Sequence, residues 1–188
     1  MASSTQVVTG KVRFSFLHVF DPYAQTEGAE KKYSATLLIP KKDKATVAKL
    51  QAAAKAARDA YREKNGKALP PESDAAIPGL GTVHDGDGQR PGGDDFGPEC
   101  KGCYVVTVSS KNPPKLVDAD KNEILDRSEL FSGCYGKAII NAFGYKQSGN
   151  AGVSFGLNAL QKLEDGEPLG AHVDVDDFDD DEDDEYKI

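Results

Sequence analysis

A strict alternation of side chains near the N-terminus constrains the fold of this chain more than any other feature. Over residues 11–20, every second residue is apolar or aromatic, apart from one histidine. A repeat of two residues with aromatic and β-branched members indicates a β-strand, and Asp21-Pro22 indicates where it ends. We expect three rings of this strand to face the core: Phe14, Phe16 and Phe20.

The rest of the chain predicts more strands around a single helix. Strands are indicated over four segments: residues 32–39, 104–109 and 116–117, and a hairpin over residues 134–160. Apolar residues between 44 and 65 recur at intervals of three and four, which indicates a helix with Asp43 as its N-terminal cap. Residues 68–99 are rich in Gly, Pro and Asp and predict a long loop. Because no strand–helix–strand pattern recurs, we expect a mainly β fold, a small antiparallel barrel or sandwich with one inserted α-helix.

Acidic residues are concentrated at the C-terminal end. Residues 172–188 contain ten Asp or Glu and one Lys, whereas residues 1–171 contain 22 basic and 21 acidic side chains. A run of this composition cannot bury a core and repels itself, so we expect residues 171–188 to be disordered. The net charge of −8 does not exclude nucleic-acid binding, because the first 70 residues carry 13 Lys or Arg and six acids.

The first strand of the predicted hairpin has the pattern of a surface that binds single-stranded nucleic acid. On one face of residues 135–146, aromatic rings alternate with lysine and asparagine. Flat rings can stack on bases, and cations can contact phosphates. The structural alternative is that Ile139 and Phe143 pack inward. We predict a binding surface with six residues in this strand and five elsewhere: Tyr135, Lys137, Asn141, Phe143, Tyr145 and Lys146, then Arg13, Lys31, Lys32, Tyr104 and Lys111.

The acidic run is itself a candidate regulatory or partner-binding segment. A tethered polyanion can compete with DNA for a cationic groove, and an aromatic residue in its middle can anchor a partner protein. The alternative is a segment that only keeps the protein soluble. The candidate residues are Asp176, Asp177, Phe178, Asp179, Asp180 and Asp181.

Patterns that suggest metal or catalytic chemistry are incomplete. Residues 118–129 match the ligand spacing of a calcium loop, but Glu123 stands where the sharp turn needs Gly. Cys100 and Cys103 form a CxxC pair without the second pair that a zinc site needs. The sequence contains no P-loop, HExxH or GxSxG motif. We therefore expect no metal, no cofactor and no enzymatic activity.

The sequence also carries signals about location. It has no run of about 18 apolar residues, and it begins without the basic and apolar regions of a signal peptide. Its three cysteines, an odd number, agree with a reducing compartment. We expect a cytoplasmic protein that makes no contact with a membrane.

Several segments, in order, resemble the tailed-phage single-stranded-DNA-binding proteins, a family long catalogued as a domain of unknown function. These segments are KVRFSFLHVF (11–20), YSATLLIPK (33–41), SKNPPKLVDAD (110–120), SGCYGKA (132–138), NAFGY (141–145) and GVSFGLNALQ (152–161). The resemblance implies an OB-fold, binding of single-stranded DNA without enzymatic activity, a role in phage replication or recombination, and an acidic C-terminal tail. Glu123 and the Gly-rich residues 85–97 depart from the family pattern.

We therefore predict an OB-fold-like antiparallel barrel over residues 8–170, with a helix at about 44–65 and a long loop at 68–99. A flexible N-terminus (1–7) precedes it, and a disordered acidic tail (171–188) follows it. The expected function is to coat and protect single-stranded DNA in the host cytoplasm. Expected partners are single-stranded DNA and, through the tail, phage or host replication or recombination proteins. The alternative is an acidic-tailed adaptor that binds proteins but no nucleic acid.

Overall fold

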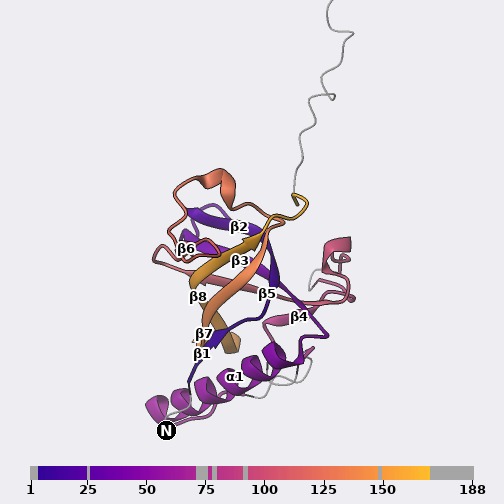
Figure 1. Ribbon diagram of the computed structural model, residues 1–188. Helices are drawn as coiled ribbons and strands as arrows, with labels where there is room; N and C mark the ends of the chain where they lie inside the picture. Colours follow the sequence, from indigo (N-terminus) through magenta and orange to yellow (C-terminus); the bar gives the residue numbers. More distant parts are fainter. Residues whose placement is uncertain are drawn as a thin grey trace, which may run out of the picture.

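The computed structural model describes residues 4–24, 26–70, 76–77, 80–90, 93–147 and 150–169 and is mainly β, with one long helix (Figure 1). The predicted acidic tail lies outside the described residues. In chain order the elements are β1 (Gln6–Val8), β2 (Val12–Tyr23), β3 (Lys32–Pro40), α1 (Lys44–Asn65), β4 (Val83–Asp85), η1 (Pro98–Cys100), β5 (Cys103–Ser110), β6 (Lys115–Val117), η2 (Arg127–Glu129), β7 (Tyr135–Gln147) and β8 (Asn150–Glu164). The predicted mainly β fold with one helix is confirmed.

The long strands pair into a closed ring. β2 pairs with β3, β3 with β5, β5 with β8, β8 with β7, and β7 returns to β2. Most of these pairings are antiparallel, as predicted, but β5 and β6 run parallel to β8. The parallel pairing with β5 arises because the hairpin closes the ring by placing β8, not β7, beside β5.

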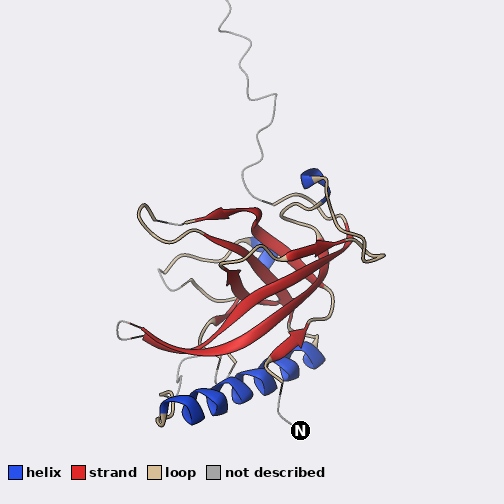
Figure 2. Ribbon diagram, turned by 90° about the vertical axis from the view of Figure 1, so that its left-hand side faces the viewer, coloured by secondary structure: helices blue, strands red, loops and turns tan. Residues whose placement is uncertain are grey.

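The helix follows from local sequence signals and packs against one side of the ring (Figure 2). Asp43 accepts a hydrogen bond from the backbone N–H of Thr46, and Gly66 ends the helix in the left-handed conformation, with φ of 73°. Its buried stripe lies against β7 at Gly144, where a Cβ would come within 3.0 Å of Tyr61. Both the predicted helix and its cap are confirmed.

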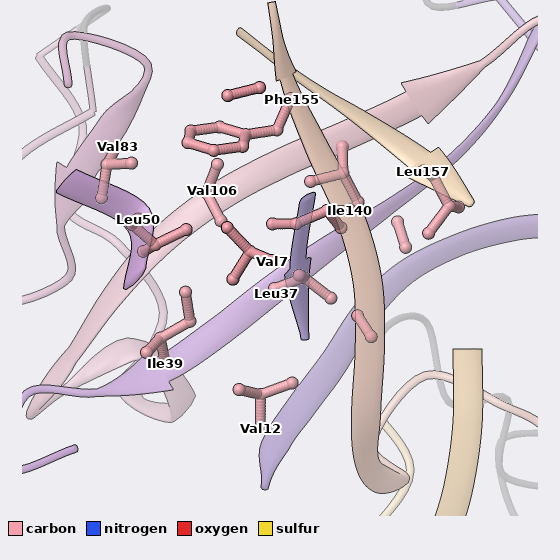
Figure 3. Packing of buried hydrophobic residues seen from close by; sticks show 14 of the residues in the cluster. Val7, Val12, Leu37, Ile39, Leu50, Val83, Val106, Ile140, Phe155 and Leu157 are labelled. Carbon is pink, nitrogen blue, oxygen red and sulfur yellow. The ribbon is translucent and has the colours of Figure 1, made fainter. Parts of the chain in front are cut away.

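The core is shared by the ring, the helix and the N-terminal strand. Leu50 of α1 and Val7 of β1 lie beside Leu37, Val106 and Ile140 of the ring (Figure 3). Val7 is 1% exposed, and β1 pairs with residues 139–141 of β7. The prediction of a flexible N-terminus is wrong for residues 6 and 7, because a strand of three residues is too short to show a repeat.

The long loop predicted over residues 68–99 also contains more structure than expected. Residues 83–85 form β4, which pairs with β5. Leu80 and Val83 are buried in the core. This short strand was not predicted because the residues around it are mostly Gly, Pro and Asp, a composition that indicates a loop.

β2 departs from the regular alternation on which its prediction rested. Its ladder with β3 pairs Ser15 with Thr36 and then His18 with Ser34, so one extra residue is inserted as a β-bulge. Phe16 lies in this bulge with φ of 45° and is 54% exposed. The prediction that Phe16 faces the core is therefore wrong, although Phe14 is fully buried and Phe20 packs against the core. The strand also continues through Asp21-Pro22 to Tyr23, beyond its predicted end.

Candidate nucleic-acid interface

A groove of about 790 Å³ lies on the outer face of β2, β3 and β5. Its floor consists of side chains that neighbour one another across the strands and therefore point to the same face. One row is Ser15, Thr36 and Thr107, and the next is His18, Ser34 and Ser109. The hydroxyls of Thr36 and Thr107 lie 3.3 Å apart and hydrogen-bond to each other. The floor is thus small and polar, which leaves room for a flat ligand above it.

Aromatic residues of β2 line one side of this groove. The rings of His18 and Tyr23 stack in parallel, with centroids 4.2 Å apart and planes inclined by 9°. Phe16 lines the groove beside them, and Tyr23 is 49% exposed. A bulky residue with positive φ carries a backbone cost of roughly 1–3 kcal/mol, and such strain clusters at functional sites. The exposed, strained Phe16 is therefore a strong candidate for contact with a ligand.

A second set of aromatic and cationic residues, from β4 and the segment after it, also lines the groove. It contains His84, Arg90 and Phe96. The guanidinium carbon of Arg90 lies 5.2 Å from the centre of the Phe96 ring, and the His84 ring centre lies 6.4 Å from it. The groove therefore has rings contributed by two separate parts of the chain, with Lys32 and Arg90 as its cations.

An ion-pair cluster fastens the segment that follows β4 to the end of β3. Lys41 Nζ lies 2.6 Å from Asp85 and 2.8 Å from Asp87. Hydrogen bonds from Lys41 lower the pKa of both carboxyl groups, and the two carboxylates raise the pKa of Lys41. Asp87 also accepts a hydrogen bond from the backbone N–H of Gly102. Each exposed pair alone contributes little to stability, but together they fix the start of the segment that carries Arg90 and Phe96.

Four of the predicted binding residues lie in or near the groove. Lys32 lines it, and Lys111 pairs at 3.5 Å with Glu30, which also lines it. Arg13 and Tyr135 line a smaller hollow of about 420 Å³ that shares Leu38 with the groove. The Arg13 guanidinium lies 5.2 Å from the centre of the Tyr135 ring. Tyr104 instead packs against the core on the other face of β5, the face of Val106, and Lys41 Nζ lies 5.6 Å from its ring centre.

The other predicted residues in β7 lie on a different part of the outer surface. The even-numbered residues Gly136, Ala138, Ile140 and Ala142 of this strand are buried, so Phe143 points outward and is 43% exposed. The alternative in which Phe143 packs inward is therefore wrong. None of the groove-lining residues comes from this surface, which we call the hairpin face: Lys137, Asn141, Phe143 and Tyr145. Lys146 was predicted with them but belongs to the opposite face of β7, the face of Gly144, which lies against Tyr61 of the helix.

The hairpin face nevertheless continues the groove floor. Ser109 on the floor pairs with Gly156 of β8, and Gly156 pairs with Asn141 of β7. Gly156 has no side chain, and the Asn141 amide lies close above it. The remaining predicted residue, Lys31, is exposed just before β3. Most of the predicted residues thus lie on one outer surface, but its centre, the groove, was not predicted.

The sequence predicted only Lys32 among the groove-lining residues. The residues that it missed include every aromatic ring and histidine of the groove and its arginine: Phe16, which was assigned to the core, and His18, Tyr23, His84, Arg90 and Phe96. The signal for Phe96 was present, because an aromatic residue is conspicuous in a segment rich in Gly and Asp. Tyr23 was missed because Asp21-Pro22, just before it, was taken as the end of the strand. No local signal marks the bulge that exposes Phe16.

The two incomplete metal-binding patterns in the sequence, the CxxC pair and residues 118–129, do not form a metal site in the described part of the structure. No group of three or more His, Cys, Asp or Glu within the described ranges is placed to hold a metal ion. Cys100 is buried with Leu38 and Val105, and burial raises the pKa of its thiol and that of Cys103. Residues 118–122 form a tight turn, in which the Asp118 carboxylate accepts hydrogen bonds from the backbone N–H groups of Asp120 and Asn122. In the described part of the chain, no helix is both long enough and apolar enough to cross a membrane.

Comparison with known proteins identifies the family. A family model described as "Enterobacter phage Enc34, ssDNA-binding protein" matches residues 5–187. The chain belongs to this family. A curated relative, putative protein p50 of Acyrthosiphon pisum secondary endosymbiont phage 1, is 26% identical over 181 residues, which is 93% of each chain. The predicted family resemblance is confirmed.

Solved structures of phage proteins share the fold. The single-stranded DNA-binding protein of bacteriophage Enc34 in complex with ssDNA matches with a TM-score of 0.73 and 22% identity, over 90% of this chain and 95% of that one. A C-terminal truncation of the Enc34 protein matches with a TM-score of 0.67 and 24% identity, over 88% of both chains. Bacteriophage T7 gp2.5, a single-stranded DNA-binding protein, matches with a TM-score of 0.59 and 15% identity, over 95% of this chain and 97% of that one.

Proposed function

We propose that this chain binds single-stranded DNA in the groove on β2, β3 and β5, without catalysing a reaction. The observation that carries the proposal is Phe16, a strained and exposed ring presented beside the stacked His18 and Tyr23. In OB-folds, the face of the second and third strands binds oligonucleotides, and β3 and β5 are the second and third strands of this ring. Family membership and the Enc34 complex with ssDNA support the same ligand.

The groove chemistry favours binding with little sequence preference. The rings that line the groove can stack with any base, and stacking contributes roughly 1–3 kcal/mol per base. Lys32 and Arg90 are placed for the phosphates, which carry no sequence information. A protein of this kind would coat and protect single-stranded DNA during phage replication or recombination, in the cytoplasm of the host cell.

The hairpin face is a proposed extension of this site. Asn141 continues the row of groove-floor residues through Gly156, and Lys137 and Phe143 are exposed on the same strand. A strand that leaves the groove over Ser109 would reach these side chains next. The hollow at Arg13 and Tyr135 adjoins the other part of the groove, at Leu38.

We also propose that the acidic tail competes with DNA for the groove. The backbone N–H of Leu169, the last described residue, donates to the carbonyl of Ser132, and the Ser132 hydroxyl contacts Leu17 beside Phe16. Leu169, which precedes the acidic tail in the sequence, therefore lies close to the groove. A flexible segment of about 17 residues spans roughly 20–25 Å, which gives a local concentration in the millimolar range. DNA that displaces the tail would free Phe178 and its acidic neighbours to bind replication or recombination proteins.

The test is titration of fluorescently labelled oligo(dT) with the full chain, followed by anisotropy at several salt concentrations. We expect affinity to fall as salt rises, with a slope of log K against log[salt] of about 0.7 per neutralised phosphate. Phe16→Ala should weaken binding roughly 5- to 150-fold, the equivalent of one stacked base. Leu125→Ala is the matched control, because Leu125 is exposed and does not line the groove.

The same titration separates this function from the adaptor. An adaptor without nucleic-acid affinity would give no anisotropy change at any salt concentration. If DNA affinity did not depend on salt concentration, Lys32 and Arg90 would have no role in phosphate binding. Loss of binding in Leu125→Ala equal to that in Phe16→Ala would show that the groove is not the site.

A further inference from the structure

We infer that Ser132 is a positioning residue for base stacking, because its hydroxyl holds the bulge of β2 in the shape that turns Phe16 into the groove. This inference rests on the proposed function. Ser132 lies between η2 and β7, at a distance of 115 residues along the chain from Leu17. The backbone N–H of Leu17, the residue after Phe16, donates to Ser132 Oγ at 3.1 Å.

This hydrogen bond replaces the one that a regular strand would provide. The ladder of β2 with β3 shifts between Ser15 and His18, so the bulge interrupts the regular pairing at Phe16 and Leu17. A partly buried backbone N–H that has left the ladder needs another acceptor. Ser132 Oγ supplies it at the residue next to the strained one.

The segment that carries Ser132 is fixed by bonds that do not involve its hydroxyl. Phe14 N–H donates to the carbonyl of Cys134, and Gly133 N–H donates to the carbonyl of Phe14. The Ser132 carbonyl accepts a bond from Leu169, as described above. Gly133 has φ of 117°, and a Cβ there would overlap the backbone of Glu167. Removing only the hydroxyl should therefore leave the segment in place and release only the bulge.

Release of the bulge should cost DNA affinity rather than folding. Phe16 is exposed, so its ring adds little to the core in either position. Without the Ser132 bond, the backbone at Phe16 can relax from its strained conformation, and the ring then spends less time in the groove. DNA would have to select the minority of molecules that still present the ring, which lowers the apparent affinity.

A double-mutant cycle tests this directly, with the full chain and labelled oligo(dT). Ser132→Ala should weaken binding roughly 3- to 10-fold, the value of one hydrogen bond, whereas Ser132→Thr, which keeps the hydroxyl, should bind like the wild type. In a Phe16→Ala background, Ser132→Ala should change affinity by less than about 2-fold, because the ring that it positions is gone. Thermal unfolding of each variant gives the folded fraction to which affinities are referred.

Hydrogen exchange of the Leu17 amide, measured by NMR on the wild type, makes the test independent of any variant. Protection of this amide supports the inference, and exchange at the rate of an open chain overturns it. Equal losses from Ser132→Ala with and without Phe16, or no loss at all, also overturn it. If Phe16→Ala weakens binding but Ser132→Ala does not, only the positioning role fails. If Phe16→Ala itself has no effect, the proposed groove fails with it.

Discussion

The groove and the hairpin face share their chemistry but differ in shape. Both present aromatic rings next to lysine or arginine on the outer surface of the ring of strands. The hairpin face is carried by one regular strand, and its side chains stand side by side along β7. The groove instead has rings from two separate parts of the chain around a hydroxyl floor. Only the groove can hold a base between surfaces, so composition alone does not distinguish a binding site from a solvated strand.

The largest expected effect is the loss of DNA affinity when aromatic rings are removed from the groove, compared with the loss when they are removed from the hairpin face. Phe16→Ala combined with Tyr23→Ala should lose more DNA affinity than Phe143→Ala combined with Tyr145→Ala, because stacking contributes ~1–3 kcal/mol for each ring that contacts a base. Anisotropy with short and long oligo(dT) measures both losses. We expect the hairpin variant to bind short oligonucleotides normally and to lose affinity only for long ones.

The reverse order would move the primary site to the hairpin face. A loss of folding in either variant, seen as a lower midpoint of thermal unfolding, would show that its rings stabilise the fold. Affinity is therefore compared per folded molecule.

The second effect concerns the surface for which the tail competes. Removing residues 172–188 should tighten DNA binding several-fold at low salt, and the gain should shrink as salt rises, because screening weakens the tail's attraction to the body. Lys32→Ala should reduce this gain if the tail occupies the groove, whereas Lys137→Ala should reduce it if the tail covers the hairpin face. A truncated chain that binds no better than the full chain at low salt would contradict competition altogether.

The parts of the fold that the sequence predicts are those set by local interactions. The helix from Lys44 to Asn65 was predicted at about residues 44–65, because its cap, its repeat and its ending glycine are all close together in sequence. The strands of the hairpin were predicted for the same reason. The β7 side chains therefore received their correct faces, with Phe143 outward.

The parts that the sequence did not predict depend on distant contacts. Phe16 leaves the core because a bulge interrupts β2, and that bulge is bonded to Ser132, 115 residues away. The segment with Arg90 and Phe96 reaches the groove because Lys41 binds Asp85 and Asp87 across the fold. A repeat of two residues cannot show where a strand will be interrupted. The hairpin face therefore looked like the better site in the sequence.

A smaller effect is expected when a lysine is removed from the groove or from the hairpin face, and the two losses should differ in how they depend on oligonucleotide length. Lys32→Ala should weaken binding to short oligonucleotides and lower the slope of log K against log[salt] by about 0.7, the value of one phosphate contact. Lys137→Ala should lower the slope only with oligonucleotides long enough to leave the groove. Salt titrations of both variants with two oligonucleotide lengths measure this difference. Equal effects at both lengths would show that the two surfaces bind the strand as one.

The smallest effect is expected at Cys100, which borders the groove but is only 4% exposed. Its side chain is buried with Leu38 and Val105, and burial raises the pKa of the thiol above its ordinary value. A thiol with a raised pKa holds its proton at neutral pH, and only the thiolate is a good nucleophile or metal ligand. Cys100→Ser should therefore leave DNA affinity per folded molecule unchanged, with at most a modest loss of stability from placing a hydroxyl in an apolar cluster. Alkylation by iodoacetamide should be slow in the native protein and should speed up as the pH rises. Rapid alkylation at neutral pH, or stoichiometric zinc in the purified protein, would show that this cysteine has a chemical role beside the groove.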